Sequence, residues 1–144
     1  MEVTQSKLTT VIRVKDILLK RQQKELADIR TQHEEASGVL KDLEDTRDQA
    51  YVDAVKTPKT KAVDVQTSEA FIRSLSRQIR QQEQTVTDIG KAEEVKCDEV
   101  TKVSQSKRML EQIEVRRKEE ADKEIERKAQ RLIDVLAQRL HSTT

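Results

Sequence analysis

A hydrophobic repeat of seven residues runs through the first third of this 144-residue chain and restricts what it can fold into. Ten of its fourteen positions are apolar. The two rows of the repeat are Leu8, Lys15, Gln22, Ile29, Ala36, Leu43 and Ala50, and Ile12, Leu19, Leu26, His33, Leu40, Arg47 and Ala54. A spacing that averages 3.5 residues keeps one narrow face of a helix against a partner helix. We therefore predict a coiled-coil helix from about residue 4 to about residue 55.

The composition favours long helices over a globular core. Hydrophobic residues make up 34% of the chain, aromatic residues 1% and charged residues 38%, with two glycines and one proline. Such a chain has few of the large side chains that a compact core requires. It is rich in good helix formers rather than in the Pro and Gly residues typical of disorder. We expect an all-α protein.

The segment at about 56–67, KTPKTKAVDVQT, interrupts the repeat. Pro58 lacks the amide hydrogen that a helix interior requires. Thr67 or Ser68 can then cap a second helix, with Glu69 near its positive end. We predict this helix from about 68 to about 140. Its apolar residues, spaced by threes and fours or their sums, are Ile72, Leu75, Ile79, Val86, Ile89, Val100, Val103 and Leu110.

A break between two matched helices predicts an antiparallel hairpin, here a single domain over residues 1–144. Facing residues then have numbers that sum to about 123. Tyr51 and Phe71, the only Tyr and the only Phe, should therefore lie opposite each other near the turn. Leu8 should face a residue near 115, so the second helix overhangs beyond about residue 116.

The overhang is apolar along one side. The residues on that side are Ile125, Ala129, Leu132, Leu136 and Leu140, and Ile133 and Val135 widen the stripe. Burying each large apolar side chain is worth about 1.5–3 kcal/mol, so an unpaired helix with this face is expected to bind a partner.

Several classes of function lack support in the sequence. A net charge of +1 gives no electrostatic reason to expect nucleic acid. A single cysteine, Cys97, excludes an internal disulfide and fits a reducing cytoplasm. The N-terminal residues contain no apolar run long enough for a signal peptide or a membrane span. No glycine-rich phosphate loop, activated nucleophile or metal-ligand cluster occurs, and we expect no enzyme activity, cofactor or bound metal.

Two short signatures accompany the hairpin pattern. The first is Phe71-Ile72-x-x-Leu75-x-x-x-Ile79, and the second is the charged C-terminal helix that leads into Leu132-Ile-Asp134-Val-Leu-Ala137-Gln-Arg139. In these features and in length the chain resembles the FliJ/YscO (SctO) stalk proteins of bacterial type III secretion. The flagellar branch and the injectisome branch, which serves virulence, fit about equally well. The resemblance implies an antiparallel coiled coil similar to the central stalk of rotary ATPases.

The resemblance also implies partners and a location. The termini end would enter the pore of the hexameric secretion ATPase, the turn end would contact the cytoplasmic domain of the export gate, and some members meet export chaperones. The protein would be cytoplasmic and peripherally associated with the apparatus at the inner membrane. By position, the ATPase-facing residues would be Arg13, Lys20, Leu132, Asp134, Leu136 and Arg139. The gate-facing residues would be Tyr51, Phe71, Leu75, Gln78 and Gln82.

Alternatives remain open at three points. Tyr51 and Phe71 can anchor a partner, or simply pack on each other to close the turn, and the two interpretations are compatible. Residues 34–53 carry two basic and seven acidic side chains, whereas residues 1–31 carry seven basic and four acidic ones, which suits either a solvated surface or docking into an acidic pore. The alternative function is a coiled-coil assembly element or an export-chaperone-binding protein that dimerises through the C-terminal helix.

Overall fold

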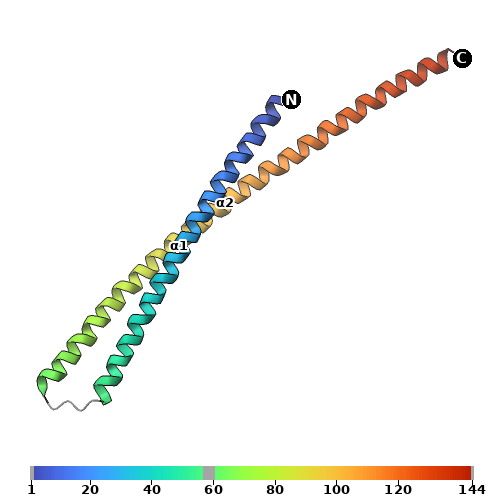
Figure 1. The fold of residues 1–144 in the computed structure, drawn as a ribbon. Coiled ribbons are helices and arrows are strands. Elements are labelled where there is room, and N and C mark those ends of the chain that lie inside the picture. The colour runs from blue at the N-terminus through green and yellow to red at the C-terminus, as the bar shows by residue number, and fades with distance from the viewer. Residues whose placement is uncertain (1, 57–60, 144) are drawn as a thin grey trace. The chain divides into compact units, whose positions relative to one another are not determined.

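The computed structural model describes residues 2–56 and 61–143, with side chains from Lys7 onward in the first helix. These residues form two long α-helices, α1 (Glu2–Lys56) and α2 (Ala62–Ser142), and no strand occurs among them (Figure 1). The helices pack against each other as a helical hairpin, which confirms the predicted all-α fold. By its contacts the chain divides into two compact units. Unit 1 contains Met1–Lys20 and Thr101–Thr144, and unit 2 contains Arg21–Val100.

The predicted seam is the buried face of both helices. All fourteen positions of the first repeat are buried or half-buried, and so are the eight apolar positions predicted for the second helix. The most buried side chains are Leu19, Leu26, Ala36, Leu75 and Ile79, of which Ile79 is only 3% exposed. Two helices can cover only one narrow stripe of each other, so the core is limited to the side chains of this seam.

Contacts within each unit confirm the antiparallel direction and the predicted register. In unit 1 the Thr9 hydroxyl donates to Glu114 at 3.3 Å, and residue numbers 9 and 114 sum to 123. In unit 2 the Arg30 Nε donates to Glu93 at 3.3 Å, with the same sum. Each unit is therefore paired as the spacing of the two repeats predicts.

The second helix begins earlier than predicted. It starts at Ala62 rather than near residue 68, and the Lys61 carbonyl accepts hydrogen bonds from the amides of Asp64 (3.1 Å) and Val65 (3.4 Å). Thr67 is not a cap, because its hydroxyl donates to the carbonyl of Val63 one turn back, at 2.9 Å. The reason is that residues 62–67 contain no Pro or Gly, and Asp64 stabilises the positive end of the helix from its first turn. Pro58, on which the predicted turn rested, lies outside the described residues.

Unit 1 contains the predicted overhang, but it is shorter than expected. Helix α1 begins at Glu2, which the register places opposite residue 121, and Ala121 and Glu124 are still half-buried. Every residue from Ile125 to Thr143 is exposed. The unpaired part of α2 therefore begins near residue 125 rather than near 116, and it measures about 27 Å at 1.5 Å per residue.

Candidate functional site

The overhanging part of α2 carries an exposed face made mainly of apolar residues, which we name the tail stripe. Its members are Ile125, Ala129, Leu132, Ile133, Val135, Leu136 and Leu140, all of them exposed. Leu132 is 66% exposed and Leu136 is 56% exposed. At 3.6 residues per turn these positions spread over about 160° of the helix surface. A coiled-coil seam is narrower, so the tail stripe suits a partner that meets the helix from more than one side.

The predicted ATPase-facing residues of α2 do not share one face. Leu132 and Leu136 are four residues apart and lie on the tail stripe, and Arg139 lies within the same arc, between Leu132 and Val135. Asp134 is two residues from each leucine and therefore lies on the opposite face of the helix. Its carboxylate accepts a hydrogen bond from the Gln130 side chain at 3.0 Å.

The predicted ATPase-facing residues of α1 lie elsewhere in unit 1. Arg13 and Lys20 are both exposed, and the Lys20 ammonium lies 3.2 Å from the Asp16 carboxylate. The register places Arg13 opposite residue 110, which is about 33 Å from Leu132 at 1.5 Å per residue of α2. The structure therefore does not bring the six predicted residues into one site, although all six belong to unit 1.

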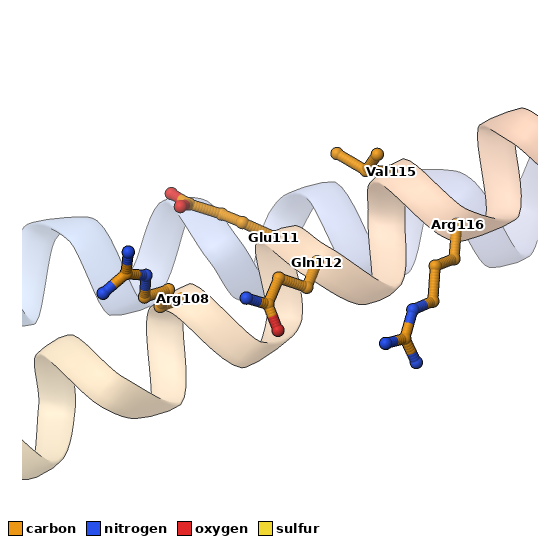
Figure 2. Close-up of a pocket in the computed structure, with 5 residues that line it drawn as sticks. All are labelled: Arg108, Glu111, Gln112, Val115 and Arg116. Atoms are coloured by element: carbon orange, nitrogen blue, oxygen red, sulfur yellow. The ribbon is translucent and has the colours of Figure 1, made fainter.

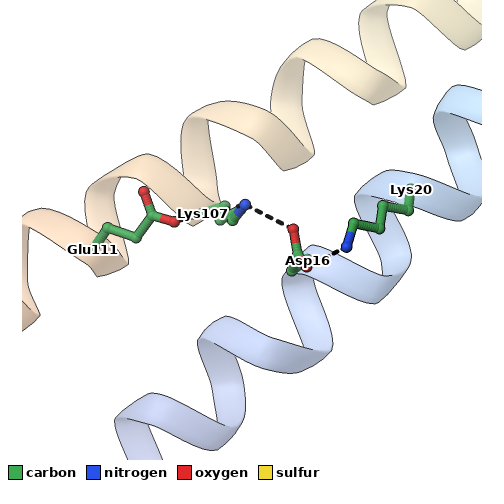
Figure 3. Close-up of polar contacts among 4 residues, drawn as sticks. All are labelled: Asp16, Lys20, Lys107 and Glu111. Atoms are coloured by element: carbon green, nitrogen blue, oxygen red, sulfur yellow. Dashed lines mark hydrogen bonds and ion pairs between the residues drawn. The ribbon is translucent and has the colours of Figure 1, made fainter.

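Polar contacts between the helices were missed at the sequence level. The Lys107 ammonium donates to the Asp16 carboxylate at 2.8 Å and also lies 3.6 Å from Glu111 (Figure 3). The hydrogen bond that Asp16 accepts from Lys107, together with that from Lys20, holds the pKa of Asp16 below its ordinary value. The hydrogen bond to Asp16 also raises the pKa of Lys107. The signal was available, because Asp16 directly follows a seam position and its number and that of Lys107 sum to 123.

Unit 2 has a matching contact. The Lys96 ammonium donates to the Glu25 carboxylate at 2.7 Å and lies 3.0 Å from Glu99. The hydrogen bond to Glu25, and after it the hydrogen bond to Glu99, raises the pKa of Lys96. The hydrogen bond from Lys96 lowers the pKa of Glu25. Each unit therefore holds one lysine between two carboxylates at the edge of its seam.

These pairs predict how stability depends on pH. The pKa values of Asp16 and Glu25 lie below their ordinary 3.8 and 4.5 in the folded state, so their contribution is present above those values and is lost as the pH falls through the lowered pKa values. The pKa values of Lys96 and Lys107 lie above 10.5, so their contribution is present below 10.5 and is lost as the pH rises through the raised pKa values. We expect the unfolding temperature, followed by circular dichroism, to be level between about pH 5 and pH 10 and to fall on either side. The variant Asp16→Asn with Glu25→Gln should show a shallower acid limb, and an acid limb identical to that of the wild type would contradict the assignment.

The predicted gate-facing residues belong to unit 2 and differ in accessibility. Phe71 is 51% exposed and lines a hollow of about 440 Å³. The other lining residues are Asp45, Thr46, Gln49, Ala50 and Asp53 of α1. Tyr51 is also 51% exposed but does not line this hollow. Tyr51 directly follows the seam position Ala50, whereas Thr46 and Asp53 of the hollow each directly precede a seam position. Residues before and after a seam position lie on opposite sides of the seam, so Tyr51 and the hollow are on different sides of α1.

The remaining gate-facing residues divide between the seam and the surface. Leu75 is 5% exposed and serves the packing of the two helices. The half-buried Gln82 side chain donates to the carbonyl of Ala36 at 2.9 Å. Gln78 is exposed and, seven residues from Phe71, lies on the same flank of α2. Tyr51, Phe71 and Gln78 are therefore the members of this set that a partner can reach.

His33 occupies a half-buried seam position of α1. Its Nδ1 lies 3.0 Å from the Glu93 carboxylate, which also accepts the bond from Arg30. A Cβ on Gly90 would lie 3.7 Å from the His33 Nε2, so the imidazole fills the space beside this glycine. No group of three or more metal-ligating side chains is found within residues 2–56 and 61–143.

A second hollow, of about 420 Å³, lies on the outer side of α2 in unit 1 (Figure 2). All of its lining residues come from that one helix: Arg108, Glu111, Gln112, Val115 and Arg116. The two arginines are eight residues apart, about 12 Å along the axis, which is too far for both to bind one small anion. This hollow is therefore a gap between side chains of one helix rather than a site where groups converge.

Charge is divided between the two units. Unit 1 carries 15 Lys and Arg and 10 Asp and Glu residues, a net +5, and unit 2 carries 13 and 17, a net −4. The near-zero charge of the whole chain thus conceals two units of opposite sign.

Comparison with known proteins gives one match. The family described as "Flagellar FliJ protein" matches residues 4–144. No curated protein and no solved structure matches the chain. None of the described helices has an apolar stretch long enough to cross a membrane.

Proposed function

Because this chain belongs to the FliJ family of flagellar and type III export proteins, we propose that it is the central stalk of a secretion ATPase. In this proposal, unit 1 binds in the pore of the hexameric ATPase, and the turn end of unit 2 contacts the cytoplasmic domain of the export gate. The family consists of non-catalytic components of the export apparatus. ATP hydrolysis would therefore take place on the ATPase, and this chain would act from the cytoplasmic side of the inner membrane.

The observation that carries the proposal is the exposed tail stripe. Seven apolar residues remain uncovered over about 160° of helix surface, and Asp134 occupies the opposite face. A flat partner could not contact both Leu132 and Asp134. A pore surrounds the helix, so it can bury the leucines on one wall while it contacts Asp134 on another.

The positive charge of unit 1 supports the same arrangement. A net charge of +5 would favour entry into a pore lined by acidic groups. Arg13 and Lys20, about 33 Å and more from Leu132 along the helix direction, would then contact the ring at another level.

The mechanism would be allosteric. A rod with an apolar side and a charged side cannot make the same contacts with six subunits of a ring. It would therefore stabilise different states in different subunits through its differential contacts.

The test is ATP hydrolysis by the cognate secretion ATPase at fixed enzyme concentration, titrated with this protein. We expect stimulation by the full chain and by a control chain that ends at His141, which keeps the whole tail stripe. A chain that ends at Glu124 keeps the paired helices and should give no stimulation. If the full chain neither changes the rate nor co-sediments with the ATPase, the stalk function is wrong.

The tail stripe also favours a second candidate, an assembly element or chaperone-binding protein in which a second copy covers this surface. Analytical sedimentation separates the two candidates. A dimer that persists on dilution and is lost in the chain ending at Glu124 would support the second candidate, and a monomer would support the stalk.

A further inference from the structure

The hollow beside Phe71 combines a half-exposed aromatic ring with two carboxylates. The Phe71 ring is half exposed, and Asp45 and Asp53 lie at positions eight residues apart along the α1 wall of the hollow, about 12 Å from each other. Between them lie Gln49 and Ala50. The apolar ring therefore faces a wall with a carboxylate toward each end.

Among residues 2–56 and 61–143, no Lys or Arg forms an ion pair with the carboxylates of the hollow. Its six lining residues include no Lys or Arg. The Asp53 carboxylate accepts a hydrogen bond from the Gln49 side chain at 2.9 Å, and Asp45 forms no ion pair with any residue of the described part of the chain. The surrounding segment 34–53 adds five further acidic side chains against two basic ones.

The chemistry of the hollow selects its occupant. An apolar partner would remove both carboxylates from water without compensation, which is costly, and an acidic partner would be repelled. A positively charged side chain can lie over the aromatic face while its charged end pairs with a carboxylate. The methylene groups of Lys or Arg also cover apolar surface.

We propose that the hollow beside Phe71 is the docking site for a Lys or Arg side chain from the segment of the export gate that contacts the turn end. This inference rests on the proposed gate contact and gives it a chemical identity. Phe71 contacts the methylene stem of that side chain, and the charged end pairs with the nearer of the two carboxylates, Asp45 or Asp53, because these lie too far apart to pair with one cation together. Gln78 lies on the same flank of α2 as Phe71, where it would contact the gate segment that carries this Lys or Arg side chain.

The test measures binding of the cytoplasmic domain of the cognate export gate to the full chain by titration calorimetry. The variant Asp45→Asn with Asp53→Asn should weaken binding about tenfold, because whichever carboxylate pairs with the cation is lost from a partly dehydrated contact. The matched control, Glu34→Gln with Asp48→Asn, removes two charges from the same acidic segment but from outside the hollow. It should change the affinity less than about twofold.

A third variant tests the ring. Phe71→Leu keeps an apolar side chain but removes the aromatic face, and it should weaken binding about fivefold, in keeping with the loss of a cation–aromatic contact. All of these positions are exposed or line the surface hollow, so circular dichroism and the unfolding temperature should match the wild type for every variant.

Three outcomes would overturn the inference. Wild-type affinity for Asp45→Asn with Asp53→Asn would show that the gate contact exists without this pairing. Equal weakening by the control variant would show a general attraction of the acidic segment rather than a local site. If the gate domain does not bind the wild-type chain at all, the proposed gate contact fails and the inference fails with it.

Discussion

Replacing Leu132 and Leu136 by aspartate is expected to abolish binding to the secretion ATPase while leaving the helix content unchanged. Both side chains are more than half exposed in the free protein, so their replacement removes no packing from the hairpin. In the proposed complex each loses about 1.5–3 kcal/mol of apolar burial. Together these losses correspond to at least about a hundredfold in affinity, before the cost of burying two carboxylates is added.

The matched control places the same two charges elsewhere on the overhang. Gln130→Asp with Ala137→Asp adds two carboxylates off the tail stripe, away from its central residues Leu132 and Leu136. Co-sedimentation and stimulation of ATP hydrolysis should be much closer to wild type for this control. Equal loss in both variants would indicate that charge, rather than the apolar surface, decides binding, and wild-type binding by the leucine variant would refute the assigned site.

Substituting Ile79 by alanine should strongly destabilise unit 2. Ile79 is the most buried of the residues whose side chains the structure describes, at 3% exposed, and it lies in the narrow seam between the helices. Removing its outer atoms leaves a cavity that two helices cannot readily close, at a cost of about 2–4 kcal/mol. We expect a large fall in the urea midpoint, followed by circular dichroism at 222 nm.

Val95 provides the control for this substitution. It lies in the same helix and the same unit but is 59% exposed. Val95→Ala should change the free energy of unfolding by less than about 0.5 kcal/mol. Equal effects at both positions would show that the seam does not pass through Ile79.

The buried seam could be predicted because, in a pair of helices, the spacing of the apolar residues along the sequence decides which side chains are buried. A repeat of 3.5 residues allows one buried face, so the positions of Leu26 and Leu75 followed from spacing without knowledge of their neighbours. The predicted register, a sum of about 123, agrees with the contacts Thr9–Glu114 and Arg30–Glu93. The start of α2 was predicted too late, because residues 62–67 are helical although Val, Thr and Asp have low helix propensity.

Surface features were harder to predict, because they depend on which side of the seam each exposed residue lies. Tyr51 and Phe71 have numbers that suit direct opposition, yet one directly follows a seam position and the other directly precedes one. The pairs Asp16–Lys107 and Glu25–Lys96 required the register to be applied to charged residues as well as apolar ones. The roles of the ATPase-facing and gate-facing residues came from family resemblance, and they stay predictions.

The division of charge between the two units has a consequence for how the protein behaves in solution. With a net charge of +1, copies of the chain repel each other only weakly near neutral pH. At the same time the +5 surface of one copy attracts the −4 surface of another. Because this attraction is screened over about 8 Å at physiological ionic strength, dilute buffers promote clustering and moderate salt keeps the molecules dispersed.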